Sequence, residues 1–251
     1  MTRSRLILIA AIAVIAVGIG GFIAYDQVLR GDSAAALTLP TASADPAASS
    51  VPDASSAAGA SVAPAASFDG RAAGTWNVAP NSVAGYRVRE QLANLPAQGD
   101  AVGRTSAVTG SITLDTSGST TTVTAGEISV DTTSITSDKS QRDDRLRREG
   151  LQTDTFPTAT FKLTKSVVVP AAALAGTASD VTLTGDLTLH GVTKSVDIPA
   201  KAQLVNGTIQ VAGSITFPLS DYSIVAPNLG GIIVSIADNG TLEFLVNFSK
   251  A

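Results

Sequence analysis

Hydrophobic and polar residues alternate along the chain from residue 74 to its end, in short runs rich in valine, isoleucine and threonine. This period of two is typical of β-strands with one buried and one wet face. The pattern predicts about eight to ten strands joined by short turns, which favours an antiparallel barrel or sandwich over a helical fold. The clearest runs are residues 108–114, 123–130, 183–189, 209–217 and 242–248.

Turn and helix signals divide these runs. Asn206-Gly207 and Asn239-Gly240 predict two-residue hairpin turns, because Asn-Gly suits the backbone of such turns. Residues 137–150 (SDKSQRDDRLRREG) are highly charged and predict one short helix, with Ser137 or Asp138 as its N-cap. Together these features predict an all-β antiparallel barrel or sandwich with one short helix.

The N-terminal residues differ from the rest. Residues 6–24 carry no charge, and a helix of this length would be about 28 Å long, close to the hydrocarbon thickness of a bilayer. Arg3 and Arg5 precede this run, so we expect its N-terminus to stay inside. The sequence thus predicts a single-pass anchor in the cytoplasmic membrane with the barrel outside, and a cleaved signal peptide is the alternative.

A low-complexity stretch rich in alanine, serine and proline follows the apolar run and has no regular apolar period. Such a stretch buries too little surface to offset the entropy of ordering it, so we expect a disordered linker. The predicted organisation is a membrane anchor over residues 1–30, a linker over residues 31–72 and a barrel domain over residues 73–251.

Composition removes many kinds of chemistry. The chain has no cysteine and one histidine, which excludes disulfides, thiolate nucleophiles, zinc–cysteine sites and sites built from several histidines. The net charge of −4 and the lack of a basic stripe argue against binding to nucleic acid. No glycine-rich phosphate loop or nucleophile elbow is present, so we expect no enzyme activity, no cofactor and no metal.

Several short motifs, in order along one domain, resemble the YceI-like family, whose members form lipid- or polyisoprenoid-binding barrels in bacterial envelopes. They are TWNVAP at residues 75–80, YRVR at 86–89, QRD with Leu146 at 141–146, FPTATF at 156–161, TGDLTLHGVTK at 184–194, and Phe217 with SDY at 220–222.

The resemblance implies an all-β, extended antiparallel barrel of lipocalin-like shape, with a lengthwise apolar cavity for an amphiphile such as a polyprenyl chain, a fatty-acyl derivative or a quinone. It implies no catalytic residues. The chain departs from the family where Glu90 and Arg145 stand in place of frequent histidines, and where residues 151–154 (LQTD) replace an acidic, aromatic patch. Aromatic residues make up 4% of the chain, which is few for filling a barrel. The alternative is an envelope structural or interaction module whose barrel is filled by its own side chains.

The candidate ligand-binding residues are mostly the inward-facing apolar side chains, together with one arginine for a polar head group. They are Trp76, Tyr86, Val88, Ile112, Leu114, Phe161, Leu163, Leu187, Leu189, Phe217, Tyr222, Phe244 and Arg142.

Other polar residues have plainer interpretations. The arginines of residues 142–148 are also consistent with a solvated helix face paired to neighbouring acids. His190 is interpreted as a turn residue, and Asp186 and Asp221 as partners of turn backbone. The expected partners are a lipid or isoprenoid amphiphile and the membrane, and a homodimer is compatible with the sequence.

Overall fold

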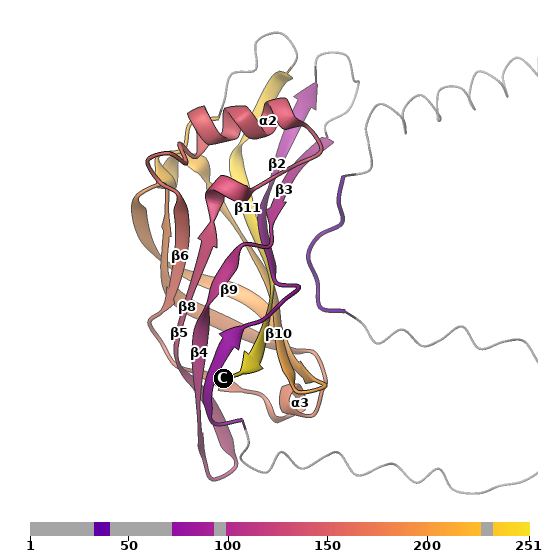
Figure 1. Cartoon of the computed structure of the whole chain (residues 1–251), viewed down its shortest axis with the longest axis vertical. Helices are drawn as coiled ribbons and strands as arrows, with labels where there is room; N and C mark the ends of the chain where they lie inside the picture. The colour runs from indigo at the N-terminus through magenta and orange to yellow at the C-terminus, as the bar shows by residue number, and fades with distance from the viewer. Residues whose placement is uncertain (1–32, 41–71, 93–98, 227–232) are drawn as a thin grey trace, which may run out of the picture.

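The alternating residues form one antiparallel sheet in the computed structural model of the chain, which describes residues 33–40, 72–92, 99–226 and 233–251 (Figure 1). Side chains on successive residues point to opposite faces, as the period of two requires. The strands are β1 (Gly74–Val78), β2 (Val83–Leu92), β3 (Gly99–Thr105), β4 (Val108–Ser117), β5 (Thr120–Asp131), β6 (Thr158–Leu163), β7 (Val167–Val169), β8 (Ser179–Leu189), β9 (Val192–Val205), β10 (Thr208–Pro218) and β11 (Ile233–Lys250).

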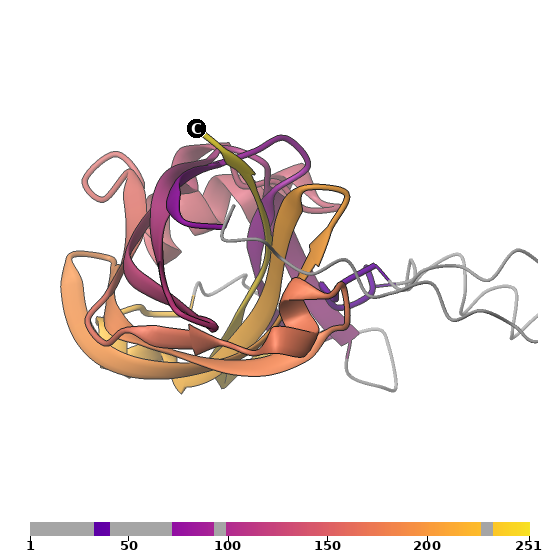
Figure 2. The ribbon, with the colours of Figure 1, turned by 90° about the horizontal axis from the view of Figure 1, so that it is seen from below.

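The sheet closes into a barrel because β1 pairs with β4 on one side and with β11 on the other. The ring β1-β4-β5-β6-β8-β9-β10-β11 contains eight strands within the described residues. β2 and β3 lengthen it, since β2 pairs with both β11 and β3. Seen along the barrel, the strands curl around in a ring (Figure 2). The predicted all-β antiparallel barrel is therefore confirmed.

Short helices lie at the two ends of the barrel. α2 (Ser140–Arg145) continues directly into η2 (Leu146–Gly150), so the predicted helix is present, and it lies across one end (Figure 1). We call this the α2 end. The four-residue α3 (Ala171–Leu174) contacts β9 near the opposite end. Single turns η1 (Thr132–Ser134) and η3 (Leu219–Tyr222) complete the helical elements of the described residues.

One of the two Asn-Gly predictions is confirmed and the other is wrong. Asn206 and Gly207 both have positive φ, 51° and 74°, and join β9 to β10 as a two-residue turn. Asn239 and Gly240 instead lie inside β11, which stays paired with β10 through both residues. The pairing of β11 with β2 shifts register just before Gly240, so the second signal marks an irregularity in a long strand.

The predicted N-terminal anchor, residues 1–30, lies outside the described residues. In the described part of the chain, no helix has the length and hydropathy needed to cross a bilayer. Most of the predicted linker also lies outside the described residues. Its residues 33–40 are described, and they lie against the outer wall of the barrel (Figure 1).

Candidate functional site

The barrel encloses a cavity of about 260 Å³ that is lined almost entirely by apolar side chains. Eight strands leave an interior wide enough for side chains or for one small ligand, and this interior is hollow, unlike the filled barrel of the alternative interpretation. Ten of the thirteen candidate residues line it, and their contact with a ligand stays a prediction. They are Tyr86, Val88, Ile112, Phe161, Leu163, Leu187, Leu189, Phe217, Phe244 and Arg142.

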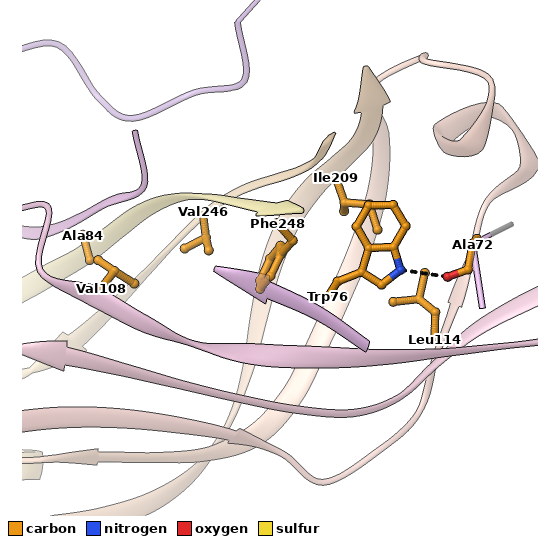
Figure 3. Close-up of a cluster of buried hydrophobic side chains, with 8 residues drawn as sticks. All are labelled: Ala72, Trp76, Ala84, Val108, Leu114, Ile209, Val246 and Phe248. Carbon is orange, nitrogen blue, oxygen red and sulfur yellow. Dashed lines mark hydrogen bonds between the residues drawn. The ribbon is translucent and has the colours of Figure 1, made fainter. Parts of the chain in front are cut away.

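The other three candidates lie outside the cavity lining. Trp76 and Leu114 are each 3% exposed and belong to a cluster that fills the end of the barrel opposite α2, which we call the closed end (Figure 3). The indole Nε1 of Trp76 donates to the carbonyl oxygen of Ala72 at 2.8 Å. Tyr222 is also fully buried, and its ring packs edge-on against Phe217 with 4.8 Å between centroids. These side chains close and support the cavity wall.

The candidate residues predicted from the sequence omitted many cavity-lining residues, several of which lie on the same strand faces as the candidates. Strand alternation was a sufficient signal for several of them, since Leu183 and Val246 lie in the same runs as the chosen residues Leu187 and Phe244. The main additions are Val108, Val123, Ile128, Val130, Leu183, Ile198, Val211, Leu242, Val246 and Phe248 from strands, with Leu146, Leu151, Ile224, Glu90 and Arg145 near the α2 end.

The α2 end of the cavity carries its charged groups. Arg142 on α2 forms an ion pair with Glu90 on β2, with 2.5 Å between Nη2 and Oε1, and it also binds Asp138. Glu90 is 6% exposed, so this carboxylate is buried with its partner. Burial acts against the charged form of Arg142, but Glu90 and Asp138 raise its pKa above the usual value. Arg142 therefore stays charged, and its charge is already matched.

Two polar atoms near this pair have no hydrogen-bond partner among the described residues. They are the hydroxyl of Tyr86 and the Nε of Arg142, both buried and both on residues that line the cavity. Buried polar groups are nearly always hydrogen-bonded, so an unpartnered pair calls for an explanation. Both atoms can donate a hydrogen bond. Both unpartnered donors therefore belong to residues that line the cavity.

Local hydrogen bonds hold α2 in place. Neither Ser137 nor Asp138, the predicted caps, is the N-cap of α2. The N-cap is Lys139, whose side chain makes no capping hydrogen bond. Ser137 instead donates from its backbone N–H and its hydroxyl to the buried carboxylate of Asp143, at 3.0 and 2.6 Å to Oδ1. Because Asp143 follows Arg142 directly, this anchor fixes the turn that presents the arginine to Glu90.

Burial raises the pKa of the Tyr86 hydroxyl above its ordinary value of 10.0, with smaller contributions from nearby charges, of which Arg142 lowers it and Asp143 and Glu90 raise it. In the unfolded chain the same hydroxyl ionises near the ordinary value. The free energy of unfolding should therefore be unaffected below about pH 10 and fall as the pH rises further. We expect Tyr86→Phe to make this alkaline fall shallower, which urea unfolding at about pH 9 and about pH 11 measures. Equal falls in both proteins would contradict the assignment.

Asp186 lies within β8 opposite Ser195, so its interpretation as a partner of turn backbone is wrong. Other polar candidates have partners within the protein. His190 lies in the turn between β8 and β9 with φ 51°, and its Nδ1 is 3.0 Å from the carbonyl oxygen of Tyr222. Asp221 pairs with Lys194 at 2.8 Å. Arg147 pairs with Asp144 three residues earlier, as expected for a solvated helix face. Within the described residues, no group of three histidine or acidic side chains could hold a metal ion.

Comparisons with known proteins agree with this geometry. The family model of the YceI-like domain matches residues 76–248. No curated protein matches the sequence. A polyisoprenoid-binding domain from Saccharophagus degradans, implicated in plant cell wall breakdown, is 22% identical with a TM-score of 0.54, covering 70% of this chain and 98% of its own. BcnA from Burkholderia cenocepacia is 18% identical with a TM-score of 0.49, covering 66% and 95%. At such identity the first likeness speaks for the fold alone.

Proposed function

The chain belongs to the family of YceI-like domains, and from this premise we propose that its barrel binds an amphiphilic lipid without catalysing a reaction. The apolar tail, an isoprenoid, fatty-acyl or quinone-like chain, would occupy the cavity. The polar head would lie at the α2 end. The likeness to the S. degradans domain, which is named as polyisoprenoid-binding, supports this choice of ligand class.

The apolar cavity is the observation that carries this proposal. Each methylene moved from water into such a site contributes about 0.8 kcal/mol. A tail of about ten methylenes would thus contribute roughly 8 kcal/mol before the cost of association is subtracted. The barrel needs no strong polar contact to bind such a tail, which fits a lining with few polar groups.

The test is to identify what the barrel holds. A chain beginning at residue 33 keeps every residue that the structure describes and lacks the apolar run at residues 6–24. Organic extraction followed by mass spectrometry should recover an amphiphile in near-stoichiometric amount, and the emptied protein should bind a fluorescent prenyl or acyl probe. A protein that yields no lipid and takes up neither probe would rule the proposal out.

The charges at the α2 end favour a neutral head group. Arg142 is matched by Glu90 and Asp138, and the unpartnered buried donors on described lining residues are the Tyr86 hydroxyl and the Arg142 Nε. An anionic head would approach the buried carboxylate of Glu90 and gain no unmatched cation there. A carbonyl, ether or hydroxyl oxygen can accept from the two donors without this cost.

Removing the carboxylate should change this preference. In Glu90→Gln, Arg142 loses its buried counter-charge, and a charge-assisted bond to an anionic head contributes about 1.5–3 kcal/mol. We therefore expect a fatty acid or prenyl phosphate to bind about tenfold more tightly or better, while a neutral prenyl alcohol changes little. Glu127→Gln, at an exposed position, is the matched control. The proposal fails here if the parent already prefers the anionic probes.

The apolar run at residues 6–24 supports a membrane anchor as a second part of the proposal. The barrel would then stand outside the cytoplasmic membrane, on a single-pass helix whose N-terminus is inside. Membrane flotation of the full chain, compared with the chain beginning at residue 33, tests this part. Equal recovery of both chains in the soluble fraction would contradict it.

A further inference from the structure

One acidic side chain points outward from the wall of the barrel and is nevertheless buried. Leu242 and Phe244 line the cavity, so alternation places Glu243 between them on the outer face. Yet Glu243 is 2% exposed. Its carboxylate lies between two arginines, 3.5 Å from Nη2 of Arg87 and 2.7 Å from Nη2 of Arg104. A buried charge on an outer wall requires a cover and paired partners.

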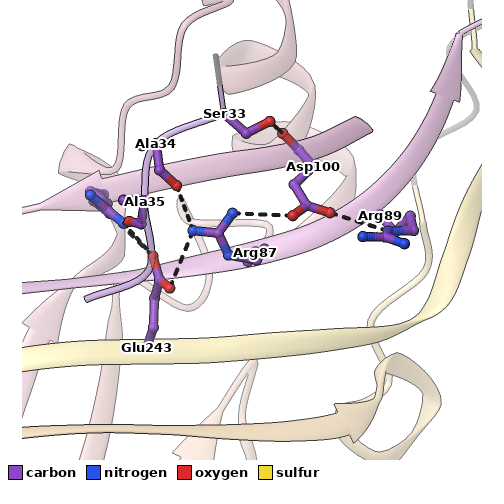
Figure 4. Close-up of polar contacts among 8 residues, drawn as sticks. Ser33, Ala34, Ala35, Arg87, Arg89, Asp100 and Glu243 are labelled. Carbon is purple, nitrogen blue, oxygen red and sulfur yellow. Dashed lines mark hydrogen bonds and ion pairs between the residues drawn. The ribbon is translucent and has the colours of Figure 1, made fainter. Parts of the chain in front are cut away.

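The backbone of residues 33–35 supplies part of this cover (Figure 4). Arg87 donates through Nη2 to the carbonyl oxygen of Ala34 at 2.7 Å, and Arg104 donates to that of Ala35. The same two guanidinium groups thus bind Glu243 and the N-terminal segment together. Beside them, the hydroxyl of Ser33 donates to the carbonyl oxygen of Asp100 at 2.9 Å.

A second set of contacts holds the other end of the same segment. Leu39 is 9% exposed, and Gln203 donates through Nε2 to the carbonyl oxygen of Pro40 at 3.3 Å. Gln203 also donates to the side chain of Gln210 at 2.8 Å, and Gln210 to that of Asn247 at 3.2 Å. The segment is therefore fastened at two separate places, by charged groups at its start and by an amide ladder at its end.

The segment has a defined direction along the barrel. Its start lies at Asp100, next to Gly99, which pairs with Glu90 at the α2 end. Its end lies at Gln203, close to the turn that joins β9 to β10, near the closed end. In Figure 1 the segment, drawn in indigo, runs along the outside of the barrel beside β2 and β3.

We propose that residues 33–40 form a docking segment that fixes the N-terminal region to the α2 end of the barrel. The predicted linker then has two different parts. Pro40 and Ala72, the described residues on either side of residues 41–71, are both held by the barrel. Residues 25–32 alone separate the apolar run from the docking segment, and this consequence rests on the proposed membrane anchor.

Docking changes both the reach and the orientation of the barrel. Eight residues, 25–32, span at most about 28 Å, whereas the 48 residues 25–72 could span about 160 Å. Without docking, the chain would enter the barrel at Ala72, which contacts Trp76 at the closed end. With docking it arrives at the α2 end. The polar end of the cavity is thereby held toward the membrane from which a lipid ligand would come.

Spin labels test the docking itself in the full chain. The sequence has no cysteine, so each introduced thiol is labelled alone. Labels at Ala36→Cys and Ser119→Cys, the second in the turn between β4 and β5, should give one narrow distance distribution by double electron–electron resonance. Adding Leu39→Asp, which puts a charge in the buried position of the segment and leaves the barrel unchanged, should broaden the distribution. Thr38→Asp, at the exposed neighbouring position, is the matched control and should keep it narrow.

A membrane measurement tests the orientation. In phosphatidylcholine vesicles with a nickel-chelating lipid, a nitroxide at Glu149→Cys, on η2, should relax faster than one at Ser119→Cys, beyond the strand end that pairs near Gly74. Leu39→Asp should remove this difference, because a released chain of 48 residues no longer holds either end of the barrel toward the membrane.

The outcomes separate the two proposals. A broad distance distribution in the parent chain overturns the docking. A narrow one with faster relaxation at residue 119, or equal relaxation at both positions, overturns the orientation. If the full chain does not bind vesicles at all, the membrane anchor of the proposed function fails and the orientation with it, while the distance measurement still decides the docking.

Discussion

Replacing Ile128 with tryptophan is expected to abolish most of the affinity of the barrel for a long-tailed amphiphile. Ile128 lies within β5, lines the cavity and pairs with Phe161, another lining residue. An interior formed by eight strands has room for one tail, so an indole in its middle stops the tail from passing. If the tail loses about five buried methylenes, it loses about 4 kcal/mol of binding free energy, which is about 1000-fold in affinity.

The control for this experiment is the neighbouring residue. Glu127 is exposed on the outer face of the same strand, so Glu127→Trp adds the same ring without entering the cavity. Fluorescent acyl and prenyl probes should bind to it as they bind to the parent. Because the new indole in Ile128→Trp occupies existing apolar space, we expect that variant to fold. Parent-like affinity of Ile128→Trp for the long probe would show that ligands bind elsewhere.

The second large effect is expected on stability, at Trp76. This side chain fills the closed end together with Leu114, Ile209 and Phe248, and its indole N–H bonds to Ala72 (Figure 3). Truncating a buried aromatic residue to alanine typically costs about 3–5 kcal/mol, because a void replaces the ring. Trp76→Ala should therefore unfold at much lower urea concentration, measured by circular dichroism since the chain has no other tryptophan.

Trp76→Phe separates packing from hydrogen bonding. It keeps an aromatic ring in the closed end and loses the bond to Ala72, so we expect a smaller cost of about 1–2 kcal/mol. This variant also serves if Trp76→Ala is too unstable to purify. Should both variants unfold at the urea concentration of the parent, the closed end would not depend on this side chain.

The sequence predicted well which residues form strands and which side chains point inward. It predicted less well how far along the barrel axis each inward side chain lies. Phe161 and Leu187 were assigned to the cavity from alternation alone, and they line it. Trp76 and Leu114 have the same inward parity but lie at the closed end. Parity follows from the local backbone, whereas height along the barrel depends on how distant strands are staggered. No local pattern separates a lining residue from one that closes an end.

The charged site shows the same limit. Arg142 was a candidate from its motif, but its partner Glu90 is distant in the chain and stood out only as a departure from the family pattern. Nothing in the sequence predicted that Glu243 is buried, since an outward carboxylate on a strand is ordinarily exposed. Its burial depends on Arg87, Arg104 and a segment far away in sequence.

The sequence by itself therefore determined the all-β class, the faces of the strands, the turn at Asn206-Gly207 and the apolar nature of the interior. Each of these follows from local backbone geometry and from the period of two. Only the tertiary structure decided that the interior stays hollow, that Glu90 neutralises Arg142, and that residues 33–40 lie on the outer wall. Those features depend on barrel closure and on long-range contacts, which bring together residues that no local pattern relates.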